Sequence, residues 1–235
     1  MKATLVLLPG LNGTKGLFAS FINRAPDDID ILSIEYPTDK ALSYEQLSLF
    51  VMDKLELING NYVILGESFS GPLSLFIADK KPLGLVGIVL VATFISAPNL
   101  RVARFLPWTL GFSLTKPLYD VRGFFSRSHN TSFIQLISAE LQKVLPSVLA
   151  HRMQQIFMVN AVSALKNCDI PIVYFRGTKD FVVPERNLLD IQAVKPDIEV
   201  VRFKTQHFLL QSAPQQAWGA IETFLNQCLL REKIS

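Results

Sequence analysis

Cysteine and histidine are scarce in this sequence of 235 residues, which has two cysteines and three histidines. Cys168 and Cys228 are far apart in the chain, so they form neither a disulfide framework nor a metal-type pair. There is no H-E-x-x-H motif, and the glycine pattern of a dinucleotide site is missing. We therefore expect no metal and no cofactor, and a reducing, cytoplasmic setting is the simplest interpretation.

Charge is also limited, since charged residues make up 18% of the chain and the net charge is +3. This mild, evenly spread excess of positive charge argues against nucleic acid as a partner. Hydrophobic residues make up 49%, which favours a folded protein over a disordered one. The 17 phenylalanines must fill a core or line an apolar cavity, and the length fits one α/β domain with an insertion.

No apolar run is long enough to cross a bilayer. The stretch Met1–Gly10 is too short for a secretory signal and ends in Pro-Gly without a small-x-small cleavage site. The longest apolar region, Leu83–Pro98, is interrupted by Gly and Thr and falls short of the ~20 residues that a spanning helix needs. Both regions are predicted to form buried strands.

Short apolar runs alternate with longer helical patterns along the chain. The runs are nearly continuous in Val, Ile and Leu, which is typical of parallel strands covered on both faces. This rhythm predicts an α/β fold with a doubly wound, mostly parallel sheet and helices on both faces. The expected strands are Ala3–Leu8, Ile29–Glu35, Tyr62–Leu65, Leu85–Ala92, Ile170–Phe175 and Ile198–Phe203, and the expected helices are Gly16–Arg24, Ser43–Ile58, Phe69–Lys80, Glu185–Ala193 and Pro214–Leu230.

Residues 95–168 interrupt the rhythm because they contain no clear strand. A structureless loop of that length is improbable in a compact domain. Thr131–Leu145 and Ser147–Leu165 show helical spacing, the second of them at Val148, Arg152, Ile156 and Val159. We therefore predict a helical cap at 95–168, inserted into a core formed by 1–94 and 169–235.

The stretch Tyr62–Pro72 carries the strongest chemical signal. An apolar run ends at Gly66, Ser68 follows two positions later, and a second small residue, Ser70, stands two positions after that. This is the arrangement that holds a nucleophilic serine on a sharp turn between a strand and a helix. Two alternatives remain at this point: a plain serine helix cap, or Ser70 as the nucleophile, although Pro72 suits a first helical turn better than the flank of such a turn.

An activated serine needs a base and a group that orients the base. Of the three histidines, His129 and His151 lie in the expected cap, whereas His207 directly follows the last expected strand. Asp180 follows the fifth strand and a Gly turn. Active sites of parallel sheets form at such strand ends, so we predict Ser68, Asp180 and His207 as catalytic residues. The alternatives are an ordinary loop histidine and a turn aspartate.

The remaining requirement is a pair of donors for a developing oxyanion. The backbone N–H of Phe69, at the start of the helix after Ser68, is the first expected donor. The loop after the first strand, Leu8–Gly16, is rich in glycine and lets the backbone approach a bound group; here Leu11 is the second expected donor. A phosphate loop is disfavoured because neither G-x-G-x-x-G nor Gly-Lys-Ser/Thr is present.

Taken together, these motifs resemble the α/β-hydrolase family. The resemblance rests on Gly66-Glu67-Ser68-Phe69-Ser70-Gly71, Pro9-Gly10-Leu11-Asn12-Gly13, Gly177-x-x-Asp180 and His207. It implies a six-stranded sheet of order 2-1-3-4-5-6, with the insertion where the family carries its cap. Many members have a His-Gly pair where this chain has Pro9-Gly10. The family commonly hydrolyses esters, thioesters or amides, although some members transfer acyl groups or have lost catalysis.

We therefore expect a serine hydrolase that cleaves a small apolar ester or thioester through an acyl-enzyme. The alternatives are an acyltransferase with the same acyl-enzyme, and a catalytically silent binding protein. An apolar substrate is expected because many large apolar side chains of the cap could line its pocket, although the same side chains could simply pack the cap on the core: Phe105, Leu106, Trp108, Phe112, Phe124, Phe125, Phe133 and Phe157.

The cap also contains basic residues interleaved with Leu, Phe and Trp. Such a mixture can bind a membrane surface. A solvated cap face with an apolar underside is the favoured interpretation. These residues are Arg101, Arg104, Lys116, Arg122 and Arg127.

Overall fold

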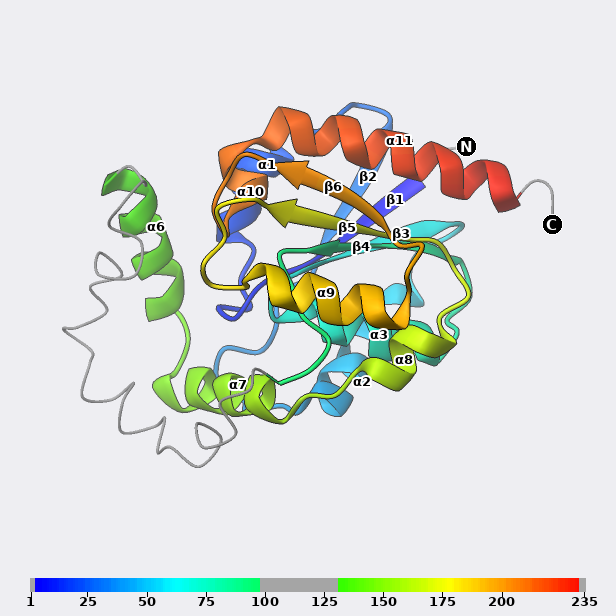
Figure 1. Cartoon of the computed structure of the whole chain (residues 1–235). Helices are drawn as coiled ribbons and strands as arrows, with labels where there is room; N and C mark the ends of the chain where they lie inside the picture. The colour runs from blue at the N-terminus through cyan, green and yellow to red at the C-terminus, as the bar shows by residue number, and fades with distance from the viewer. Residues whose placement is uncertain (1–2, 98–130, 233–235) are drawn as a thin grey trace.

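The computed structural model describes residues 3–97 and 131–232, and six parallel strands run through its centre (Figure 1). The strand order is β2-β1-β3-β4-β5-β6. This confirms the predicted doubly wound α/β sheet and the order that the family resemblance implied. The strands are β1 (Ala3–Leu8), β2 (Ile29–Ser33), β3 (Tyr62–Glu67), β4 (Leu85–Val91), β5 (Ile172–Gly177) and β6 (Glu199–Phe203).

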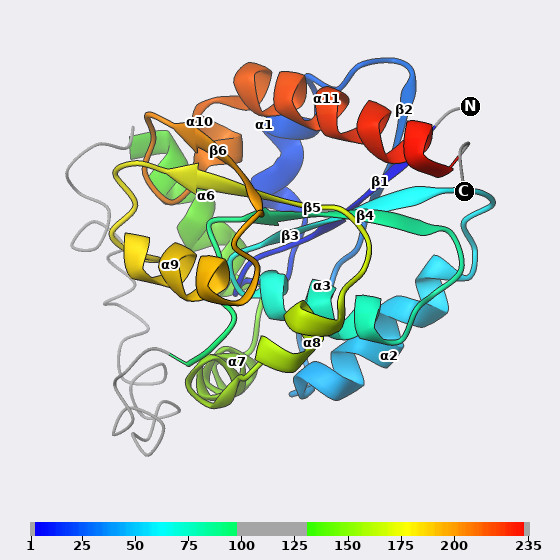
Figure 2. The same cartoon turned by 45° about the vertical axis from the view of Figure 1, so that its right-hand side comes forward.

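Helices cover both faces of the sheet, as Figures 1 and 2 show. One face carries η1 (Gly16–Phe18), α1 (Ala19–Ile22), α10 (Leu209–Ser212) and α11 (Pro214–Glu232). The other carries α2 (Tyr44–Leu55), α3 (Ser70–Asp79), α8 (Val162–Asn167) and α9 (Glu185–Val194). Two further helices, α6 (Thr131–Gln142) and α7 (Pro146–Met158), lie beyond the carboxyl ends of the strands.

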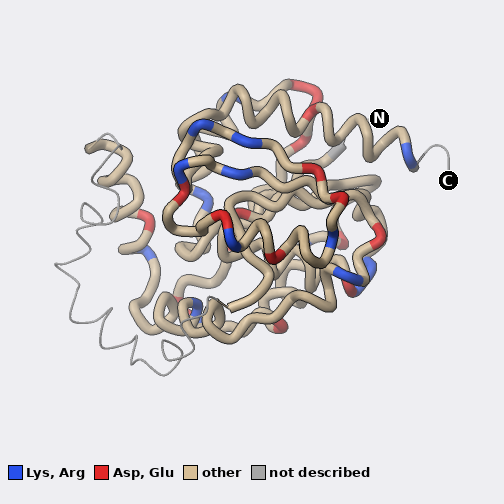
Figure 3. Tube along the Cα trace, in the orientation of Figure 1, with Lys and Arg blue, Asp and Glu red and all other residues tan. Residues whose placement is uncertain are grey.

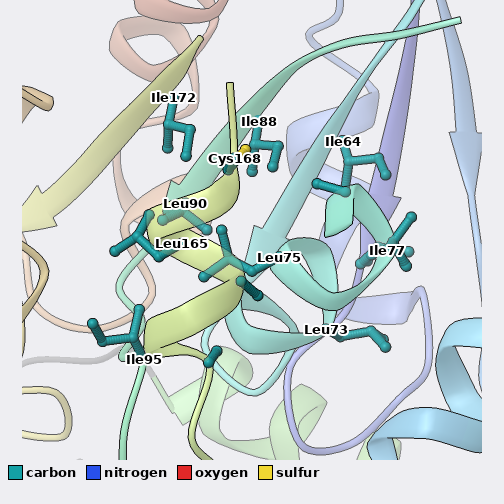
Figure 4. Close-up of a cluster of buried hydrophobic side chains, with 14 of the residues drawn as sticks. Ile64, Leu73, Leu75, Ile77, Ile88, Leu90, Ile95, Leu165, Cys168 and Ile172 are labelled. Atoms are coloured by element: carbon teal, nitrogen blue, oxygen red, sulfur yellow. The ribbon is translucent and has the colours of Figure 1, made fainter. Parts of the chain in front are cut away.

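Two apolar layers hold the helices on the sheet. On the α3 side, side chains of β3, β4 and β5 pack against α3 and α8, and Figure 4 shows Ile64, Ile88 and Leu90 among them. On the opposite side, α11 packs its apolar stripe, which includes Trp218, against the other face of the strands. Because both faces are covered, β3, β4 and β5 are buried along their whole length.

The two edge strands differ from this pattern. Most residues of β2 and β6 are partly exposed, since each pairs with only one neighbour and the helices do not fully cover the sheet margins. Strand β2 also ends at Ser33, before the expected Glu35. Figure 3 shows basic and acidic residues interspersed along the described trace.

A local sequence signal accounts for the start of α2. The side chain of Ser43 accepts from the Gln46 N–H and the Gln46 side chain accepts from the Ser43 N–H, so α2 begins with a capping box. The single helix expected over 147–165 is instead two helices, α7 and α8. The break occurs because Val159 is extended and Asn160 forms an isolated antiparallel bridge with Ser96.

The strand register brings together segments that are distant in sequence. Leu8 pairs with Gly66, so the loop after β1 begins beside the turn after β3. Gly177 pairs with Phe203, so the loops after β5 and β6 also begin side by side. All four loops leave the carboxyl edge of the sheet, where parallel α/β folds form their binding crevices.

Candidate active site

Ser68 occupies a strained turn between β3 and α3. Its φ angle is +52°, in the left-handed region that non-glycine residues rarely adopt. A β-carbon on Gly66 would lie 2.6 Å from the carbonyl oxygen of Ser70, so only glycine fits at that position. The close approach of β3 and α3 therefore places Ser68 on a sharp turn, where its side chain is partly exposed.

Ser70 is fully buried, and its hydroxyl is committed to structural hydrogen bonds. It donates to the carbonyl of Pro9, and its oxygen lies 2.6 Å from the Tyr36 hydroxyl. Because the Ser70 hydroxyl donates to Pro9, Tyr36 must be the donor in the second bond. Ser70 thus ties the turn to the loop after β1 and is not available as a nucleophile, which leaves Ser68 as the candidate.

Ser68, His207 and Asp180 form a continuous chain of hydrogen-bonding atoms. His207 Nε2 lies 3.1 Å from Ser68 Oγ, and His207 Nδ1 lies 2.9 Å from Asp180 Oδ2. A carboxylate only accepts, so Nδ1 carries the proton and Nε2 accepts from the serine hydroxyl. The structure therefore brings together the three side chains that the sequence singled out, in a protonation pattern suited to withdrawing the serine proton.

Asp180 is held rigidly in the loop between β5 and α9. Its Oδ1 accepts the N–H groups of Val182 and Val183, each at 2.9 Å, which leaves Oδ2 for His207. Arg176 Nη1 lies 3.6 Å from Oδ2. With one oxygen fixed by the backbone, the carboxylate presents the other in a single direction, and that direction sets the orientation of the imidazole.

The two expected oxyanion donors, Leu11 and Phe69, follow Gly10 and Ser68 directly in the chain. A β-carbon on Gly10 would lie 3.8 Å from Cβ of Ser68, so the loop after β1 contacts the turn directly. Within residues 3–97 and 131–232, neither the Leu11 N–H nor the Phe69 N–H donates a hydrogen bond. Both N–H groups are therefore available as donors, as the predicted oxyanion hole requires.

The other predicted or considered residues lie apart from this cluster or outside the described chain. His151 is on α7, where burial and the charge of Arg152 lower the pKa of its imidazole and a hydrogen bond with the backbone of Leu42 offsets part of that fall. His129, the expected basic residues and most of the expected aromatic residues of the cap lie outside the described residues. Phe133 is described, and its ring packs edge-on at 5.2 Å against Phe208, next to His207. Phe157 is described as well, as a partly exposed side chain of α7.

Glu67 is a buried acid beside this site that the sequence analysis did not single out. It accepts a hydrogen bond from Gln211 Nε2 at 3.2 Å, and Oε2 would lie 4.0 Å from a β-carbon on Gly10. Burial raises the pKa of the Glu67 carboxyl, and the attraction of His207 and the bond from Gln211 offset only part of that rise. An acid directly before the serine, at the end of a fully buried strand, is a signal that could have revealed it.

The raised pKa of Glu67 predicts a pH-dependent stability. The folded state binds this proton more tightly than the unfolded chain, so the free energy of unfolding falls as pH rises above the ordinary carboxyl value. Glu67→Gln removes this loss. We expect the melting temperature of the variant, relative to the wild type, to rise as the pH is increased from the ordinary carboxyl value of about 4.3 toward neutral pH. A difference that stays constant over that range, measured by thermal denaturation in matched buffers, would contradict the assignment.

Within the described part of the chain, no group of three or more His, Cys, Asp or Glu side chains is arranged to hold a metal ion. Cys168 and Cys228 are both buried and unpaired with each other. No described helix is both long and apolar enough to cross a membrane.

The strand order, the strained serine turn and the loops that meet at the carboxyl edge of the sheet together define the α/β-hydrolase fold. No protein-family model matches the sequence, and no curated protein matches it either. The fold is nevertheless shared with many solved structures, and it is the fold that the resemblance to the α/β-hydrolase family implied.

Three of these solved structures illustrate the likeness. A carboxylesterase of the ammonia-oxidizing thaumarchaeon Nitrososphaera gargenis matches with a TM-score of 0.82 and 15% identity, over 98% of this chain and 92% of the other. The enol-lactonase from Burkholderia xenovorans matches at 0.77 and 15%, over 96% and 92%. A lipase-esterase related protein from Clostridium acetobutylicum matches at 0.75 and 15%, over 95% and 94%.

Proposed function

We propose that this protein is a serine hydrolase that cleaves a carboxylic ester or thioester with an apolar acyl or alcohol group. The observation that carries the proposal is the unbroken contact from Ser68 through His207 to Asp180, at 3.1 and 2.9 Å. The shared fold agrees with this chemistry but does not decide it, because one fold supports many activities.

In the proposed reaction, Ser68 Oγ attacks the carbonyl carbon while its proton passes to His207 Nε2. Asp180 stabilises the resulting imidazolium, and the N–H groups of Leu11 and Phe69 bind the oxyanion of the tetrahedral intermediate. Collapse breaks the bond to the alcohol or thiol, which leaves with the proton from His207. Water then attacks the acyl group on Ser68, His207 again takes and returns a proton, and the acid is released.

An apolar substrate is part of the proposal. The Phe208 ring packs edge-on against the imidazole of His207 at 5.4 Å, and Phe133 of α6 extends this aromatic surface. We propose residues 95–168 as a cap, of which α6 and α7 lie over the carboxyl edge of the sheet. Aromatic surface beside the base favours an acyl or alcohol group without charge.

The decisive experiment is covalent labelling. A fluorophosphonate probe is expected to label the native protein on Ser68, mapped by mass spectrometry, and heat-denatured protein should remain unlabelled. Turnover of p-nitrophenyl esters of increasing acyl length then defines the acyl group, and product analysis with added alcohol separates hydrolysis from acyl transfer. Native protein that is neither labelled nor able to turn over any ester in the series would refute the proposal.

A further inference from the structure

The loop between β1 and η1, residues 9–15, is held from outside the sheet by two charged side chains. Arg152 of α7 is only 2% exposed. Its guanidinium donates to the carbonyls of Leu11 at 3.0 Å, Asn12 at 2.8 Å and Pro37 at 2.9 Å. Two of these three carbonyls belong to the loop that carries the proposed oxyanion donor.

Arg152 has no counter-ion among the described residues, since no described carboxylate lies within 4.0 Å of it. Its guanidinium lies 5.6 Å from the centre of the Tyr36 ring. Burial lowers the pKa of Arg152 to about 10, so the side chain stays charged at neutral pH. Burying a charge is unfavourable unless polar groups surround it, and here the dipoles of the three carbonyls stabilise the buried guanidinium.

Glu140 of α6 binds the other end of the same loop, at Thr14. Its carboxylate, which is also buried, accepts from Thr14 Oγ1 at 2.6 Å and from Lys143 Nζ at 2.6 Å. Thr14 Oγ1 in turn accepts from the Asn12 side chain at 2.6 Å. The loop is thus fixed by a cation that binds its carbonyls and an anion that binds its hydroxyl, each from a different helix.

These contacts determine where the loop amides point. Peptide units are planar and trans, so the Asn12 carbonyl that Arg152 holds directs the Gly13 N–H of the same unit to the opposite side, toward the Gly10 carbonyl. The Gly10 carbonyl in turn shares its peptide unit with the Leu11 N–H, so Arg152 acts on that N–H through Gly13 and Gly10. The turn itself is tight: the Gly13 N–H donates to the Gly10 carbonyl at 3.0 Å, and Gly13 has φ +71°. A β-carbon on Gly13 would lie 2.7 Å from Cζ of Arg152, so the guanidinium fills the concave side of the turn.

We propose that Arg152, assisted by Glu140, is a positioning residue that holds the Leu11 N–H toward Ser68 and so assembles the oxyanion hole. This inference rests on the proposed hydrolase function. It assigns to α6 and α7 a part in catalysis that is separate from substrate binding. Neither side chain touches the reacting atoms, because both act through the backbone of residues 10–14.

The test compares Arg152→Met with Arg24→Met, in which an exposed arginine that donates to a helix carbonyl is lost in the same way. Active sites are first counted by fluorophosphonate titration, so that all rates refer to competent serines. We expect Arg152→Met to lower kcat by about 10- to 100-fold with KM changed less than about threefold, because one oxyanion donor is displaced. Arg24→Met should match the wild type. Arg152→Lys, which keeps the charge, should recover part of the loss.

A second measurement isolates the oxyanion. A trifluoromethyl ketone adds Ser68 Oγ reversibly and forms an alkoxide where the ester oxyanion would lie, whereas the matching methyl ketone reports ground-state binding. Arg152→Met should weaken the trifluoromethyl ketone by the same factor as kcat and leave the methyl ketone unchanged. Glu140→Gln, whose side chain has the same size and can still hydrogen-bond, should also weaken the trifluoromethyl ketone and not the methyl ketone, by a smaller factor than Arg152→Met.

Loss of stability alone must be separated from mispositioning. Leu225→Ala creates a cavity between α11 and the sheet, on the face opposite α3. This variant should have a lower melting temperature and an unchanged kcat per titrated site. If Arg152→Met does not fold, Glu140→Gln carries the test. Unchanged kcat and ketone affinity per titrated site in both variants would overturn the inference while the wild type remains a hydrolase; an unlabelled wild type would instead overturn the proposed function.

Discussion

Ser68→Ala is expected to lower kcat/KM for short p-nitrophenyl esters by a factor of about 10⁴ or more. In the proposed mechanism the variant lacks only the oxygen that attacks the carbonyl carbon, so His207 has no proton to withdraw from a nucleophile. Rates should be measured with enzyme at high concentration, so that any residual turnover from the oxyanion hole is detected above the background.

The fold of this variant should be unaffected. Alanine accepts the positive φ of residue 68 about as poorly as serine does, so the strain in the turn stays the same, and the Ser68 N–H still donates to the Val91 carbonyl at 2.8 Å. Ser48→Ala is the matched control, because it deletes one hydroxyl that bonds only to the Glu45 carbonyl in α2. Turnover by Ser68→Ala at the level of Ser48→Ala would exclude Ser68 as the nucleophile.

Much of the fold could be predicted from the sequence because its signals are local. Continuous Val, Ile and Leu runs mark strands covered on both faces, and the structure has β3, β4 and β5 buried as those runs require. The serine turn is also local, since small residues at 66 and 70 and a strand before them occur within a few positions. Ser68 directly follows β3, Asp180 and His207 lie in the loops that follow β5 and β6, and parallel strands place their carboxyl ends at one edge.

The contacts that the sequence did not reveal are long-range ones. In the sequence, Arg152 occurs among apolar residues at helical spacing. Its partners in the structure are backbone carbonyls far away in the chain, and no residue pattern encodes a carbonyl. Similarly, the break between α7 and α8 follows from the bridge between Asn160 and Ser96, which depends on the tertiary arrangement. An arginine inside an apolar stripe is nevertheless a usable signal, because a buried charge must be compensated.

Asp180→Asn is expected to lower kcat/KM by about 10³- to 10⁴-fold, although the change replaces one atom. The reason lies in the two oxygens of Asp180. Oδ1 accepts two backbone N–H groups, so the amide oxygen of asparagine must take that place to keep both bonds. The amide NH₂ then faces His207 Nδ1 and donates to it. The imidazole must carry its proton on Nε2, and this tautomer cannot accept the Ser68 proton.

The change of tautomer should lower activity without lowering stability. The variant should keep its melting temperature close to that of the wild type, since the backbone bonds survive, but its rate of fluorophosphonate labelling should fall with kcat/KM. Asp180→Ala should be less stable than Asp180→Asn, because the Val182 and Val183 N–H groups lose their acceptor. Asp197→Asn, which removes the same charge from an exposed loop residue, serves as the control. Equal activity of Asp180→Asn and Asp197→Asn would show that His207 keeps its tautomer without this carboxylate, and the orienting role of Asp180 would have to be abandoned.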